Sequence, residues 1–238
     1  MNSRRTYPSI RLALTMLIAL FGALAALAVS GARDAEAHRS GERHATAAST
    51  ELSGTRPISQ KELAFRNDMR RLWEDHVTWT RLAVISLTTD SPDTEATVGR
   101  LLRNQADIGD AVKPFYGEAA GAELTRLLRE HILIAADLIA AAKADDEAAV
   151  AEAQSRWTVN ADEIARFLAS ANPRFWKLDE MKEMLHEHLR LTTNEVVARL
   201  QGDWAADVAA YDEIHLQALR MADMLSTGII GQFPKRFR

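Results

Sequence analysis

The chain has 238 residues, of which 29 are Lys or Arg, 33 are Asp or Glu and none is Cys. Without cysteine there can be no disulfide, no thiolate metal ligand and no cysteine nucleophile. The formal net charge of −4 gives no electrostatic basis for binding a polyanion, so we expect no nucleic-acid partner.

The first 37 residues have the pattern of an export signal. Arg4 and Arg5 precede an apolar run from Leu12 to Val29, and an A-x-A pattern occupies residues 35–37. We therefore expect a protein exported to the periplasm or the cell exterior. The apolar run has 18 residues, close to the minimum for a membrane-spanning helix. An uncleaved N-terminal membrane anchor is thus the alternative to a cleaved signal.

Residues 38–57 are rich in Ser, Thr, Ala, Gly, Arg and His and have no apolar periodicity, which is typical of a flexible linker. From residue 58 to residue 234, apolar residues recur at steps of three and four, as on amphipathic helices. The sequence therefore predicts one all-α domain over residues 58–234.

Local signals divide this domain into six helices. Ser59 followed by Glu62 is a capping-box pattern at the start of the first helix. Pro114 is expected to end the second helix, because proline disfavours helix in the residue before it. The predicted helices cover about 59–87, 94–112, 119–142, 147–169, 178–200 and 204–230.

A short sequence pattern occurs three times, at residues 72–76, 127–131 and 184–188, and each copy ends in a histidine. These residues, His76, His131 and His188, are 55 and 57 positions apart, which is about the length of one helical hairpin. We therefore predict a bundle built from three repeated antiparallel helical hairpins.

An aspartate follows each of the first two histidines at the same distance. Asp107 lies 31 residues after His76, and Asp162 lies 31 residues after His131. The midpoint of each pair falls at a predicted turn, so the two side chains should lie at the same height on antiparallel helices. We therefore expect His76 to pair with Asp107 and His131 to pair with Asp162.

The third hairpin departs from this pattern. Its predicted turn near Gly202 places position 217 opposite His188, and Asp223 then lies about 9 Å further along the helix. His215 is almost level with His188. We expect His215 to take the place that an aspartate has in the other two hairpins.

The repeated set has two interpretations. In the first, its members bind a first-row metal ion such as zinc or iron inside the bundle. In the second, the pairs are buried structural ties in a non-catalytic structural or protein-interaction module. The histidines meet only if the hairpins wrap around a common axis; in a row they stay about 10 Å or more apart. The candidate metal ligands are His76, His131, His188, His215, Asp107 and Asp162.

No phosphate-binding loop, nucleophile elbow or haem-attachment motif is present, so the sequence identifies no catalytic residue. A third interpretation is a small-molecule pocket lined by Trp79, Arg81 and Tyr116. The identity of any small-molecule or protein partner stays open.

Four segments resemble an uncharacterised family of small bacterial all-helical proteins. They are LWEDHVTWTR at 72–81, KPFYG at 113–117, NADEIA at 160–165 and YDEIH at 211–215. The likeness spans roughly residues 70–234. It implies an all-helical fold and carries no activity or catalytic residue with it.

Overall fold

The computed structural model describes residues 57–238. Within this range the chain forms six α-helices and one short 3₁₀ helix, and no strand occurs. These elements are α2 (Gln60–Thr89), α3 (Thr94–Tyr116), α4 (Glu118–Lys143), α5 (Glu147–Ala171), α6 (Leu178–Gln201), α7 (Trp204–Gln232) and η1 (Pro234–Phe237). The predicted all-α fold class and the six helices are confirmed.

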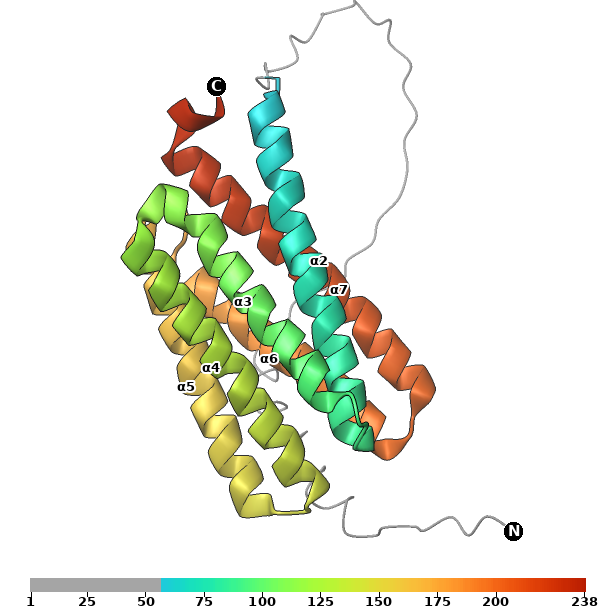
Figure 1. Ribbon diagram of the computed structural model, residues 1–238. Coiled ribbons are helices and arrows are strands. Elements are labelled where there is room, and N and C mark those ends of the chain that lie inside the picture. The colour runs from blue at the N-terminus through green and yellow to red at the C-terminus, as the bar shows by residue number, and fades with distance from the viewer. Residues whose placement is uncertain (1–56) are drawn as a thin grey trace, which may run out of the picture.

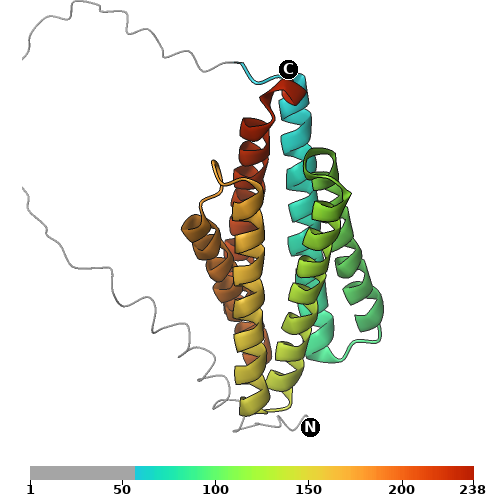
Figure 2. The same ribbon diagram turned by 90° about the vertical axis from the view of Figure 1, so that its left-hand side faces the viewer.

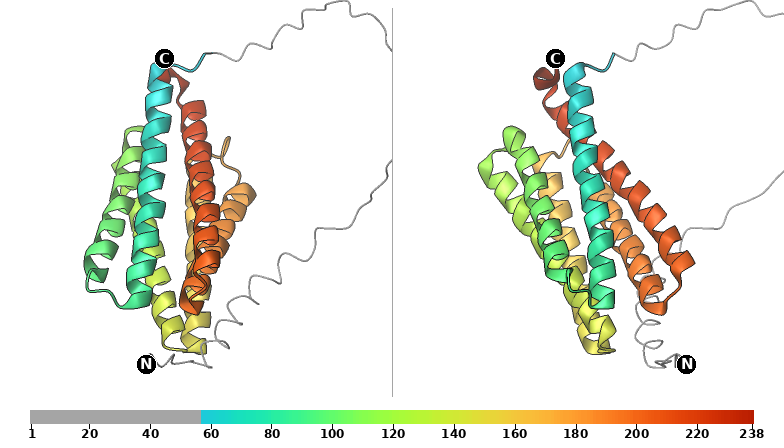
Figure 3. Two further views of the ribbon diagram at one scale, coloured as in Figure 1. Left: turned by 90° about the vertical axis from the view of Figure 1, so that its right-hand side faces the viewer. Right: turned by 45° about the vertical axis from the view of Figure 1, so that its right-hand side comes forward.

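The helices form a closed ring around one core (Figure 1). Each helix packs against the next in the chain, and α7 returns to pack against α2. Figures 2 and 3 show that the helices run along a common long axis, with the main loops gathered at the two ends. Side chains that face inward from distant parts of the sequence therefore meet at the axis of the bundle.

The predicted end of the second helix is wrong by about one turn. Helix α3 passes through Pro114 and ends only at Tyr116. A proline so near a helix end removes a single backbone hydrogen bond, and the packing of the last turn outweighs this loss. The helix stops where Gly117 adopts a φ of 88°, a conformation that favours glycine, and its N–H donates to the Lys113 carbonyl at 2.8 Å.

Both ends of the described chain lie at the same end of the bundle (Figure 1). The Ser59 side chain forms the predicted capping box with Glu62, and its hydroxyl also donates to the carbonyl oxygen of Phe237. The Phe237 ring is 4% exposed and lies 5.1 Å from the Phe65 ring between centroids. The packed region therefore extends beyond the predicted boundary at residue 234.

The predicted export signal, its Leu12–Val29 run and most of the predicted linker lie outside the described residues. Among the helices of residues 57–238, none is both long and apolar enough to cross a bilayer.

Helices α3 and α4 approach each other closely at a pair of glycines. A β-carbon built on Gly109 would lie 2.6 Å from the carbonyl oxygen of Gly121, and one built on Gly121 would lie 2.7 Å from the carbonyl oxygen of Gly109. Both distances are shorter than a van der Waals contact. This contact therefore requires a residue without a side chain on each helix.

We predict that Gly121→Ala lowers the free energy of unfolding by about 1–3 kcal/mol, because the added methyl group forces the two backbones apart. The matched control is Gly99→Ala, at an exposed position of α3 where a β-carbon meets nothing within 4 Å. The control should gain about 0.5–1 kcal/mol from the better helix propensity of alanine. Urea unfolding measures both changes, and equal effects would contradict the close approach.

Candidate functional site

Three histidines from three different helices meet in the core. His76 comes from α2, His131 from α4 and His188 from α6. The ring centroids of His76 and His188 are 5.7 Å apart, and those of His131 and His188 are 6.2 Å apart. The exposed fraction of each residue is 4% or 5%. All three histidines therefore lie in the core of the bundle.

An amide side chain from the next helix holds the His131 ring. The Nδ1 atom of His131 lies 2.9 Å from Oδ1 of Asn160 on α5. The Nδ2 group of Asn160 donates to the Leu127 carbonyl at 3.2 Å, so its oxygen is the atom that faces the ring. Nδ1 must therefore be the donor, and in the neutral imidazole Nε2 then carries the lone pair.

The same arrangement holds the His188 ring. Its Nδ1 atom lies 3.0 Å from Oε1 of Gln217 on α7, and Gln217 Nε2 donates to the Met184 carbonyl at 3.0 Å. The amide follows the histidine by 29 residues, as Asn160 follows His131. In both cases the accepting carbonyl belongs to the residue four positions before the histidine.

Two amides share this role beside His76. Asn104 Nδ2 donates to the Leu72 carbonyl at 3.0 Å, again four positions before the histidine, and Asn104 also hydrogen-bonds the His76 side chain. Gln105, 29 residues after His76, places its Nε2 atom 3.2 Å from Nδ1 of the ring. Beside His76, the adjacent residues Asn104 and Gln105 thus share the contacts that a single amide side chain makes beside His131 and beside His188.

All three imidazoles are neutral at pH 7. Burial, assisted by the neighbouring imidazole rings, lowers the pKa of His76 and of His131 to about 3. The hydrogen bonds to Asn104 and Asn160, in which the amide oxygen accepts, raise the pKa but have a smaller effect than burial. Burial also lowers the pKa of His188. The core therefore contains three uncharged rings, and in His131 and His188 the Nε2 lone pair is available to a cation.

The predicted pairing of histidine with aspartate is wrong. Asp107 is exposed on α3, whereas His76 is buried. Asp162 accepts hydrogen bonds from Lys182 at 2.7 Å and from His186 at 2.9 Å, both on α6. Asp107 follows Gln105 by two residues, and Asp162 follows Asn160 by two residues. A step of two residues rotates the side chain by about 200° around the helix. The aspartates therefore lie on a different face from the core amides.

His215 is not the partner of His188. Its Nε2 atom donates to Glu74 on α2 at 2.7 Å, and its ring stacks on Tyr211 with 5.9 Å between centroids. His215 precedes Gln217 by two residues, so the same rotation takes it out of the core. The true partners did have a signal in the sequence. Gln105 and Asn160 each stand two residues before a predicted aspartate, and Gln217 stands at the position that the turn places opposite His188.

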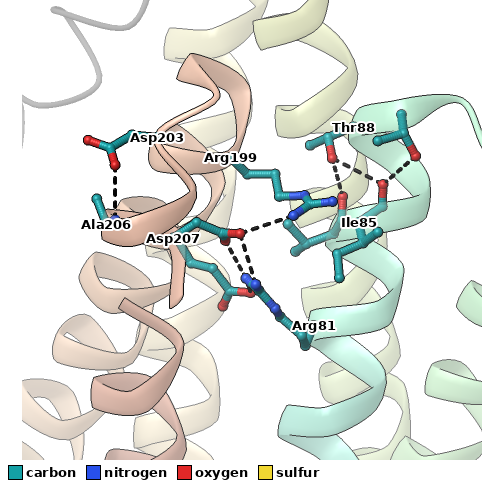
Figure 4. A network of polar contacts seen from close by, with 10 residues as sticks. Arg81, Ile85, Thr88, Arg199, Asp203, Ala206 and Asp207 are labelled. Atoms are coloured by element: carbon teal, nitrogen blue, oxygen red, sulfur yellow. Dashed lines mark hydrogen bonds and ion pairs between the residues drawn. The ribbon is translucent and has the colours of Figure 1, made fainter. Parts of the chain in front are cut away.

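A buried ion cluster joins α2 to α6 and α7 (Figure 4). The Arg81 guanidinium donates to Glu195 at 2.9 Å and to Asp207 through both terminal nitrogens, and the two carboxylates are each 1% exposed. Arg199 donates to Asp207 at 3.0 Å. Two arginines therefore balance two buried carboxylates at the place where the ring of helices closes.

The third interpretation, a pocket lined by Trp79, Arg81 and Tyr116, does not match the geometry. The Arg100 guanidinium lies over the Trp79 ring at 5.2 Å, whereas Arg81 belongs to the ion cluster. Tyr116 donates to Gln232 at 2.6 Å. The three side chains thus have separate partners on different neighbours.

Within residues 57–238, no group of three or more His, Asp or Glu side chains could hold a metal ion as it stands. The three core rings are near one another but are not closed around a common point.

Comparison with protein families, with curated proteins and with solved structures gives no match to this chain. The function must therefore be inferred from the geometry of the site.

The ion cluster gives a prediction about acid stability. Burial raises the pKa of Asp207, but the hydrogen bonds from Arg81 and Arg199 outweigh burial and leave it below its ordinary value. A carboxyl with a depressed pKa stabilises the fold above its unfolded-state pKa of about 4, and this stabilisation is lost as the pH falls through the folded-state value. Asp207→Asn should therefore cost about 3 kcal/mol at pH 7.

Between pH 5 and pH 2, the variant should lose less stability than the parent protein, because it lacks the carboxyl that must be protonated. Urea unfolding across this pH range measures the difference. Asp212→Asn, at an exposed position of the same helix, is the control and should behave like the parent. Identical acid sensitivity in the Asp207 variant and the parent would contradict the assignment.

Proposed function

We propose that His76, His131 and His188 bind a transition-metal ion at the centre of the bundle. The observation that supports this most directly is that three neutral imidazoles from three helices meet there, each held at Nδ1 by an amide. The Nε2 lone pairs of His131 and His188 are then two of the ligand atoms. His76 faces the NH₂ group of Gln105 at Nδ1, so it supplies an Nε2 lone pair only in the tautomer in which its Nδ1–H donates to Asn104 instead. Metal-binding histidines commonly donate their other ring nitrogen to such an acceptor, which fixes both the tautomer and the ring orientation.

The spacing of the rings is close to that of a closed site. With metal–nitrogen distances of about 2.1 Å, the centroids of neighbouring imidazoles around a tetrahedral ion are about 5 Å apart. The separations of 5.7 Å and 6.2 Å exceed this value by roughly 1 Å. Binding in this proposal draws the rings inward by that amount, and the fourth position stays open to another ligand. Zinc and iron(II) both accept neutral imidazole.

We also propose that the pairs α2–α3, α4–α5 and α6–α7 are three copies of one hairpin. The interval from histidine to the contacting amide is 29 residues in all three. In each, an amide also donates to the carbonyl four positions before the histidine. Three copies arranged in a closed ring give one ligand each to the axis, so the repeat supplies a three-ligand set.

A structural role is the alternative function, and one observation favours it. Each Nδ1 atom already has an amide partner, so the three contacts can serve as ties between helices without any metal. The protein would then be a structural or interaction module. Export, with or without a membrane anchor, stays a prediction under both functions.

Metal binding is tested by thermal unfolding and by elemental analysis. Zinc should raise the melting temperature of the metal-free protein, because a ligand that binds only the folded state stabilises it by mass action. His131→Ala should lose this shift and should also lose bound zinc. His215→Ala is the matched control, because this histidine lies outside the core cluster, and it should keep both.

His131→Ala should also destabilise the metal-free protein by about 1–3 kcal/mol, because Asn160 is left without its partner. The structural alternative predicts this loss alone, with no effect of a chelator on the parent protein. No thermal shift of the parent with zinc or iron(II) would refute the metal proposal.

The amides give a separate prediction. Asn160→Leu should weaken zinc binding about 10–100-fold while leaving all three histidines in place, because the His131 ring loses the bond that orients it. Asn194→Leu, at an exposed position of α6, is the control and should bind zinc as the parent does. Calorimetric titration gives both affinities, and equal values would mean that the amide does not position the ligand.

A further inference from the structure

Two apolar cavities lie along the bundle on opposite sides of the three histidines. The first has a volume of about 40 Å³, and Val196 is part of its wall, so we refer to it as the Val196 cavity. Thr80, Ala135 and Thr192 also line it, and each follows one of the three histidines by four residues. One helical turn therefore separates each ring from this cavity.

The second cavity has a volume of about 30 Å³ and is lined by Leu225, so we refer to it as the Leu225 cavity. Trp73, Leu128 and Leu185 also line it, and each precedes one of the histidines by three residues. Each histidine therefore has a residue of its own helix in the wall of each cavity, one on either side of it along the helix. The three rings thus lie between the two cavities.

The Val196 cavity is unsuited to water. Its volume exceeds the roughly 15 Å³ that a water molecule needs, but a buried water also needs two to four polar partners. The Thr80 and Thr192 hydroxyls in the wall already donate to the carbonyls of His76 and His188, respectively. Thr193 Oγ1, without a partner among the described residues, is a single polar group. An uncharged apolar molecule suits this wall better.

We propose that the Val196 cavity binds an uncharged diatomic gas of the size of dioxygen and holds it beside the three histidines. Its volume is far below that of a cavity that binds benzene, which is about 150 Å³, so the occupant must be very small. The role of this gas as a ligand for the open metal position rests on the proposed function. The binding of the gas in the cavity does not depend on the proposed metal site.

Xenon is the probe for occupancy, because dry apolar cavities bind it. In metal-free protein under xenon pressure, the methyl resonances of Ala83, Ile132 and Val196, which line the cavity, should shift and saturate. Ala83→Val fills the space with two methyl groups and should weaken xenon binding at least tenfold. Ala151→Val, at an exposed position of α5, should leave it unchanged.

If Ala83→Val does not fold, Ala136→Val tests the same cavity from the α4 wall. A parent protein without saturable shifts, or filled variants that bind xenon as the parent does, would overturn the inference.

Nitric oxide added to protein loaded with iron(II) tests the role at the metal. The paramagnetic signal of an iron–nitrosyl should form in the parent, and its affinity for nitric oxide should fall at least tenfold in Ala83→Val while iron binding stays the same. Protein that binds iron but not nitric oxide would overturn this role and leave the proposed function standing. Protein that binds no metal would refute both, and the xenon result alone would then decide occupancy of the cavity.

Discussion

The hydrogen bond between each core histidine and an amide of the next helix is the contact on which the arrangement of the core depends. A buried imidazole cannot carry charge at low cost, and its N–H needs an acceptor. Asn160 meets this need and also donates to a carbonyl one turn before His131. One side chain thus fixes the height and the rotation of two helices at once, and Gln217 does the same for His188.

The closed ring converts these local ties into a common centre. If α7 did not return to α2, the three helix pairs could lie in a row and their histidines would stay apart. The cluster of Arg81, Glu195 and Asp207 stands at this closure and links α2 to both helices of the last pair. Because its carboxylates are buried, it tolerates little misalignment, and it therefore helps to select the ring over a more open arrangement.

The helices and their relative heights could be predicted because both depend on local signals. Turn residues and apolar periodicity set the helix ends, and counting from the turns placed position 217 opposite His188 correctly. The partners of the histidines were predicted wrongly, because titratable residues are the more usual partners of a buried histidine. Asp107 and Asp162 were therefore expected in place of Gln105 and Asn160, which stand two residues earlier. Closure of the ring, and with it the meeting of the histidines, depends on contacts between α2 and α7 that no local pattern encodes.

The contact between Ser59 and Phe237 has a consequence for chain connectivity. Because both ends of the described region lie at one end of the bundle, a short peptide could join them without crossing the core. The α2–α3, α4–α5 and α6–α7 turns lie at the opposite end (Figure 1). The ring could then be opened at a different loop, so the order of the helix pairs along the chain is not dictated by the fold. Circularly permuted chains that begin at Glu118 or Leu178 would retain the same core.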